Sequence, residues 1–95
     1  MVWTLADCWQ RHTNSPETFE IPNDVDIASL KPGDFAKLIF QAVGAGERMW
    51  VKVDERTGQN FSGWLANTPA TIDGLNVGDR IEFHARHIAQ VRRVE

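Results

Sequence analysis

Four side chains belong to the types that bind zinc or act as a nucleophile and its base: Cys8, His12, His84 and His87. Cys8 and His12 would lie one turn apart on a single helix face, whereas His84 and His87 lie near the other end of the chain. Nothing in the spacing joins the two pairs, and a lone helical cysteine commonly acts as a small core residue. We therefore expect no metal site, no cofactor and no catalytic residue.

An enzyme remains the alternative interpretation. It would be a small-ligand-binding or hydrolytic enzyme that uses Cys8, His84 or His87. However, no nucleophile motif such as G-x-S-x-G occurs, and the glycines around Ala45 lack the Lys-Ser/Thr pair of a phosphate-binding loop. The sequence favours a protein without catalytic activity.

A second group of side chains is suited to binding. The alternation from Glu47 to Val53 is typical of a strand whose inner face carries Met49, Val51 and Val53. The opposite face of this strand carries tryptophan, arginine and lysine, and tryptophan and arginine dominate the energetics of protein interfaces. The candidate binding residues are those of this face and of the loop after the third predicted strand: Lys37, Arg48, Trp50, Lys52, Asn67 and Pro69.

These residues also have structural interpretations. We favour one for Trp64 and for the buried side of Trp50, which would form a second core layer with Ile39 beneath a helical stripe of Leu5, Cys8, Trp9 and His12. Asn67 is expected to satisfy loop amides. Arg48 with its neighbour Glu47 would equally make a surface ion pair worth less than about 1 kcal/mol.

Composition excludes several classes of protein. The chain has 95 residues, 42% hydrophobic and 24% charged, which is typical of one globular domain, residues 1–95. The net charge of −3 makes nucleic acid an unexpected partner, and no aromatic residues interleave the basic tail of Arg86, Arg92 and Arg93. The single cysteine, the lack of a signal-peptide pattern and the lack of an apolar run of about 20 residues predict a cytoplasmic protein without a membrane partner.

Three segments are expected along the chain. Residues 1–14 read as an N-terminal helix with Thr4 as its N-cap, and residues 15–33 as an extended connection with a turn between Asp24 and Leu30. A helix this short must dock on the domain or on a second chain, so a homodimer through it is one expectation. Residues 34–95 form the β-rich core.

Within that core, period-two alternation predicts strands at 35–40, 47–53, 60–66 and 80–84. If Asp54 pairs with Asn60, Trp50 stands directly across from Trp64. Two similar segments, Leu30–Asp34 and Leu75–Asp79, read as turns that begin strands, and residues 84–94 as a turn with a final strand or as a short helix. The predicted core contains Leu38, Phe40, Met49, Val51, Val53, Phe61, Leu65, Ile81 and Phe83.

The predicted fold class is mainly β, a β-rich α+β arrangement. It is a small, strongly bent antiparallel sheet or SH3-like barrel of about four to five strands with a short N-terminal helix.

Several segments, in order, carry a family pattern: Leu30 to Phe40, Glu47 to Val51, Phe61-x-Gly63-x-Leu65-x-Asn67-x-Pro69, Gly78-Asp79-x-Ile81-x-Phe83 and His87-Ile88. They resemble the YegJ-like bacterial family, and the resemblance covers the chain roughly from Phe19 to Val91. The resemblance implies a bacterial origin and a compact β-rich domain, and it transfers no catalytic residue. The segment around Glu47 is more distantly similar to small bacterial immunity proteins. The leading hypothesis is a non-enzymatic protein-interaction module, an immunity or accessory protein that binds another protein.

Overall fold

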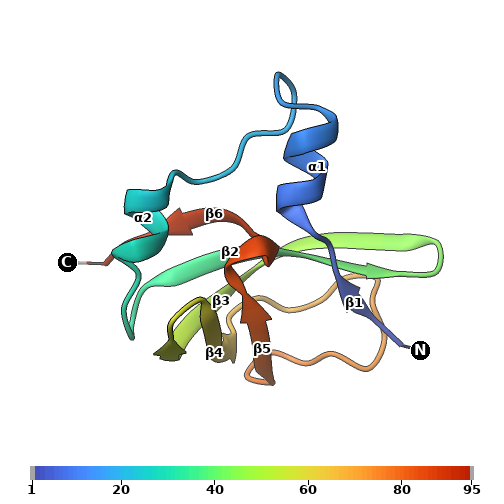
Figure 1. Cartoon of the computed structure of the whole chain (residues 1–95). Helices are drawn as coiled ribbons and strands as arrows, with labels where there is room; N and C mark the ends of the chain where they lie inside the picture. Colours follow the sequence, from blue (N-terminus) through green and yellow to red (C-terminus); the bar gives the residue numbers. More distant parts are fainter. Residues whose placement is uncertain (1, 95) are drawn as a thin grey trace.

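A curled antiparallel sheet is the main element of the computed structural model, which describes residues 2–94 (Figure 1). Four strands follow one another as a meander: β2 (Phe35–Ala42), β3 (Ala45–Thr57), β4 (Asn60–Leu65) and β5 (Arg80–His84). The last strand, β6 (Ile88–Arg92), returns to pair with β2, and the two-residue β1 (Thr4–Leu5) lies along the same strand. The helices are α1 (Cys8–Asn14), α2 (Asp24–Ala28) and the 3₁₀ turn η1 (Ala85–His87).

This half-barrel confirms the predicted mainly β, strongly bent antiparallel sheet. Leaving aside the two-residue β1, the described residues contain five strands, as expected. Residues 84–92 form the turn and final strand, not the short helix. No helix among the described residues is long and apolar enough to cross a membrane.

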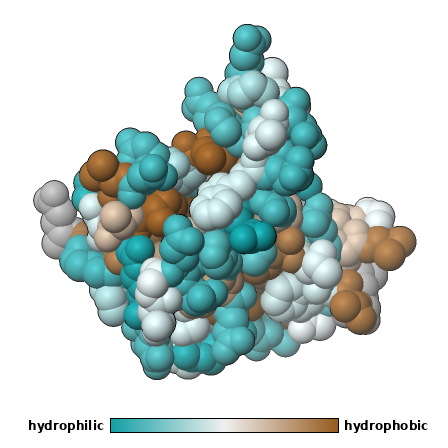
Figure 2. Space-filling view, viewed as in Figure 1, coloured by the Kyte–Doolittle hydropathy of each residue, from teal (hydrophilic) through white to brown (hydrophobic). Residues whose placement is uncertain are grey.

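The inner face of the sheet holds the main core. All nine predicted core residues are buried there, because the period-two pattern assigns each strand's faces correctly. The loops, the 3₁₀ turn and the first residue of β6 add further core residues that the predicted strands could not supply: Leu30, Ile72, Leu75, Ala85 and Ile88. Figure 2 shows mostly hydrophilic residues on the visible surface, with apolar ones near α2 and at the far end of the β2–β3 hairpin, where Val43 is 93% exposed.

The predicted register of β3 against β4 is wrong. Trp64 pairs with Lys52, not with Trp50. The hairpin turn is shorter than expected, because Gly58 adopts a φ of 62°, which a two-residue turn of this kind needs at its first position. A bulge at Asp54 then shifts the pairing. The two tryptophans consequently lie diagonally on the same face of the sheet.

The N-terminal segments also differ from expectation. Thr4, the expected N-cap, lies in β1, and α1 begins after Asp7, whose Oδ1 accepts the N–H of Gln10 at 3.0 Å. In the connection over 15–33, the segment expected to turn between Asp24 and Leu30 contains the short helix α2, which Asn23 caps in the same way. Met1, the first residue of the predicted segment 1–14, and Glu95, the last residue of the predicted segment 34–95, lie outside the described residues.

A smaller core covers part of the outer face of the sheet. Ala6, Cys8 and Ile39 are buried there, with Phe19, Ile21 and Ala89 packed against them. Part of the predicted second layer is thus present, with Ile39 beneath α1. The tryptophans are not in this cluster: Trp64 is 43% exposed and Trp50 is half-buried. The smaller core therefore covers only one end of the outer face.

Candidate binding face

Strand register brings basic and aromatic side chains together on the uncovered part of the outer face. Phe35 of β2 pairs with Lys52 of β3 on one side and with Arg92 of β6 on the other. Lys52 pairs in turn with Trp64, and Trp64 with Arg80 of β5. Directly paired residues share a face. With the neighbouring pair of Lys37 and Trp50, these exposed or half-buried residues make up what we term the open face: Phe35, Lys37, Trp50, Lys52, Trp64, Arg80 and Arg92.

Each tryptophan of the open face is stacked with a cation. The Nζ of Lys37 lies 4.7 Å from the ring centre of Trp50, and the guanidinium carbon of Arg80 lies 5.1 Å from that of Trp64. Such contacts contribute about 0.5–1 kcal/mol at exposed sites. They hold both rings in place while leaving charge at the surface.

The cations of the open face differ in their partners. Arg80 is paired with the carboxylates of Asp54, at 3.2 Å, and Glu55, at 3.7 Å. Within residues 2–94, no carboxylate lies in ion-pair range of Lys37, Lys52 or Arg92. The face therefore carries positive charge that the described part of the chain does not neutralise.

A hollow of about 200 Å³ opens beside these cations, lined by Phe35, Trp50, Ala66, Asn67 and Arg92. Asn67 is held beside this hollow by a hydrogen bond, in which its Oδ1 accepts the backbone N–H of Trp50 at 2.6 Å. The side chain of Asn67 therefore satisfies a backbone amide of strand β3 and not, as expected, an amide of its own loop. Its Nδ2 remains as the group able to donate to a ligand.

Arg48 lies away from the open face. Its guanidinium carbon is 5.6 Å from the ring centre of Phe19, and that of Arg11 is 5.9 Å from the same ring. Arg48 also lines a separate groove of about 500 Å³ beside the acidic connection before α2. Its role is therefore partly to hold that connection against the sheet.

Glu47 anchors the loop that contains Pro69. Its carboxylate accepts the N–H groups of Ala70, Thr71 and Ile72 at 2.6–3.0 Å, so the expected Glu47–Arg48 ion pair is not formed. These bonds, that of Ala70 foremost, lower the pKa of Glu47 to about 2. Pro69 itself does not line the hollow.

Cys8, His84 and His87 meet where α1 packs on η1, but not as a nucleophile and its base. The thiol of Cys8 donates to the backbone carbonyl of His87 at 3.4 Å, and burial raises the pKa of this thiol. The two imidazoles serve as backbone caps, since Nδ1 of His84 accepts from Arg86 N–H and Nδ1 of His87 from His84 N–H, each at 3.0 Å. Burial lowers the pKa of His87. Residues 2–94 contain no cluster of three metal-binding side chains.

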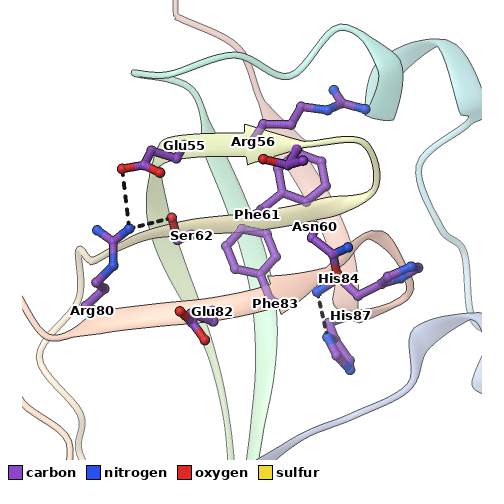
Figure 3. A pocket seen from close by; sticks show the side chains of 11 residues that line it. Glu55, Arg56, Asn60, Phe61, Ser62, Arg80, Glu82, Phe83, His84 and His87 are labelled. Atoms are coloured by element: carbon purple, nitrogen blue, oxygen red, sulfur yellow. Dashed lines mark hydrogen bonds and ion pairs between the residues drawn. The ribbon is translucent and has the colours of Figure 1, made fainter.

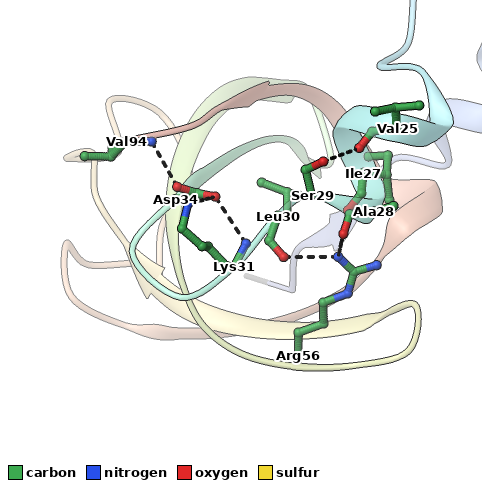
Figure 4. Close-up of polar contacts among 9 residues, drawn as sticks. All are labelled: Val25, Ile27, Ala28, Ser29, Leu30, Lys31, Asp34, Arg56 and Val94. Atoms are coloured by element: carbon green, nitrogen blue, oxygen red, sulfur yellow. Dashed lines mark hydrogen bonds and ion pairs between the residues drawn. The ribbon is translucent and has the colours of Figure 1, made fainter.

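A groove of about 510 Å³ beside these histidines is also lined by Glu55, Arg56, Ser62 and Arg80 (Figure 3). Its arginines are used within the chain. Arg80 donates to the Oγ of Ser62 at 2.8 Å, and Nη1 of Arg56 donates to the carbonyl oxygens of Ile27, Ala28 and Leu30 (Figure 4). This groove therefore offers a ligand less unneutralised charge than the open face.

Phe35, Arg80 and Arg92 are not among the binding residues predicted from the sequence, and Trp64, although predicted on the outer face, is expected to have a structural role. Alternation alone would have placed Phe35 with Lys37 on one face of β2. The other three join the face through the pairing of β4, β5 and β6, and the sequence carries no local signal for that register.

Fold and face together define a small β-rich domain with an exposed basic and aromatic surface. The family model described as "Uncharacterized protein conserved in bacteria (DUF2314)" matches residues 17–94, and the chain belongs to this family. The match includes α2 and strands β2 to β6, with all of the open face, and it begins after α1. Comparisons with curated proteins and with solved structures give no match.

Proposed function

We propose that this protein is a non-enzymatic interaction module that binds another protein through the open face. The observation that carries the proposal is a pair of cation-stacked tryptophans, Trp50 and Trp64, beside cations that have no carboxylate partner among the described residues. Tryptophan and arginine are the side chains that most often dominate interface energetics.

The narrower proposal is a cytoplasmic immunity or accessory protein of the YegJ-like type. It is supported by the resemblance of the Glu47 region to small immunity proteins and by membership of a bacterial family. A homodimer through α1 is a separate proposal that light scattering would test. The contacts of Trp9 with His84 and Arg86 give α1 a docking site on its own chain.

The enzyme alternative has less support from the geometry. It needs an ionisable, accessible thiol near an imidazole. Cys8 is fully buried, and its thiol contacts a carbonyl rather than a histidine ring. Selective alkylation of Cys8 in the folded protein at neutral pH would revive this alternative.

Affinity capture tests the proposed function. Wild type is compared with Lys52→Gln/Trp64→Ser on the open face and with a matched control, Arg93→Gln/Val43→Ser, which also changes one exposed cation and one exposed apolar residue. A lysate of a bacterium that encodes the chain is passed over each, and retained proteins are identified by mass spectrometry. We expect one protein held by wild type and control but lost from the face variant. Equal retention by all three would contradict the proposal.

A further inference from the structure

We infer that the part of the partner that docks on the open face is an acidic segment, with one of its carboxylate side chains seated in the hollow beside Trp50. This inference rests on the proposed function and goes further, because it names the chemistry of the partner.

The cations without a carboxylate partner among residues 2–94 surround a single point of the sheet. Lys52 and Arg92 flank Phe35 from the two neighbouring strands, which places them about 10 Å apart at the usual strand spacing. Lys37 lies two residues further along β2 on the same face. Three cations thus border one aromatic residue, and an extended acidic segment lying across the strands would place carboxylates near each of them.

This group of three cations contrasts with the chain as a whole, which is acidic. The sequence has 10 basic and 13 acidic residues, for a net charge of −3. Many of the acids lie away from the open face, in the connection before α2 and in α2 itself: Glu17, Glu20, Asp24 and Asp26. Among the nearer carboxylates, Asp54 and Glu55 are taken by Arg80, while Glu82 lies on the edge strand β5. An acidic partner would therefore be attracted to this face and repelled by the acidic end of the domain.

The hollow fits one carboxylate side chain. Phe35 and Trp50 provide half-buried apolar walls for its methylene groups. Arg92 can bind the carboxylate, and the Nδ2 of Asn67 can donate to it, because the Oδ1 of Asn67 is already used by the backbone. A neutral or basic side chain would leave the Arg92 charge unpaired at the edge of a partly apolar site.

The tryptophan rings argue against single-stranded nucleic acid as the occupant. Stacking proteins present open aromatic faces to successive bases. Here Lys37 lies over the ring of Trp50 and Arg80 over that of Trp64, so each ring already has a cation on one face.

Peptide titration followed by NMR tests the inference. The probe is a short synthetic peptide of alternating glutamate and valine, compared with its glutamine counterpart and with a single-stranded oligothymidylate. We expect the glutamate peptide to shift the indole N–H signals of Trp50 and Trp64 and the amide of Phe35. Its affinity should fall about tenfold in Lys37→Gln/Lys52→Gln and fall with added salt, because exposed ion pairs are screened. The control Arg93→Gln should retain the wild-type affinity.

Three results would overturn the inference: equal binding of the glutamate and glutamine peptides, no shift at the open face with either peptide, or shifts there with the oligothymidylate alone. Failure here is distinguishable from failure of the proposed function. A partner captured by wild type and lost from Lys52→Gln/Trp64→Ser, combined with no binding of the glutamate peptide, leaves the interaction module standing and refutes only the acidic segment.

Discussion

The side-chain Oδ1 of Asn67 accepts the backbone N–H of Trp50 at 2.6 Å, while the N–H of the preceding residue, Ala66, donates to the carbonyl of Trp50 at 2.9 Å. Asn67 therefore continues the β3–β4 ladder one step beyond the end of β4. This bond positions the tryptophan within the open face.

Replacing Asn67 separates its structural role from its role in binding. Asn67→Ala leaves the N–H of Trp50 without its acceptor, which should lower the free energy of unfolding by about 1–3 kcal/mol in urea denaturation. Asn67→Asp keeps an acceptor oxygen and should retain most of the stability at neutral pH. The same variant places a negative charge in the hollow, so it should lose the glutamate peptide. Retained peptide affinity in Asn67→Asp would contradict a carboxylate site.

Acid stability depends on Glu47. Its pKa in the folded protein is about 2, below the ordinary value of 4.5, because of the N–H groups of Ala70, Thr71 and Ile72. The stabilisation from these bonds is therefore fully present above about pH 4.5 and is lost as the pH falls towards 2. Wild type should be more stable than Glu47→Gln near neutral pH, and the difference should shrink near pH 3. Urea unfolding at both pH values measures it, and a difference that does not change with pH would refute this role for the carboxylate.

The strand faces of the core were predictable from the sequence because alternation is a local signal, and each strand is long enough to display it. The two similar turns were also predictable: in each, the aspartate N–H donates to the residue three before it, at 3.0 Å for both Asp34 and Asp79. The burial of Asp34 was not predictable, because it depends on the N–H of Val94, which is 60 residues away and 2.9 Å from the carboxylate (Figure 4).

The binding face was harder to predict for the same reason. Lys37, Trp50 and Lys52 follow from alternation within single strands. The positions of Trp64, Arg80 and Arg92 depend on a two-residue turn at Gly58, a bulge at Asp54 and the return of β6 to β2. Arg48 has the right face on β3 but meets Phe19, because the connection crosses the sheet there. Sequence alone does not fix that crossing.

The close approach of β3 and β4 requires glycine at position 63. A Cβ built on Gly63 would overlap the carbonyl oxygen of Lys52 and lie 2.8 Å from a methyl carbon of Val51. Gly63→Ala should therefore destabilise the fold by about 1–3 kcal/mol, since backbone cannot move aside cheaply. Gly46→Ala is the matched control, because its Cβ would meet only the carbonyl oxygen of Phe40 at 3.9 Å. Equal melting temperatures for the two variants would show that the strands can separate at this point.

The attachment of α2 depends on Arg56. This five-residue helix is too short to be stable alone, and Nη1 of Arg56 donates to carbonyl oxygens at its C-terminal end, at 2.7 Å for Ile27 and 3.1 Å for Ala28. Arg56→Lys keeps the charge but has no counterpart of Nε, which donates to the Gly58 carbonyl at 2.8 Å and orients the guanidinium, so a single ammonium group cannot make both this bond and those to α2. We expect faster amide hydrogen exchange in α2 with little change in β2 and β3, and no such change in the control Arg93→Lys. Unchanged exchange in α2 would mean that the packing of Ile27 against the main core holds the helix without the arginine.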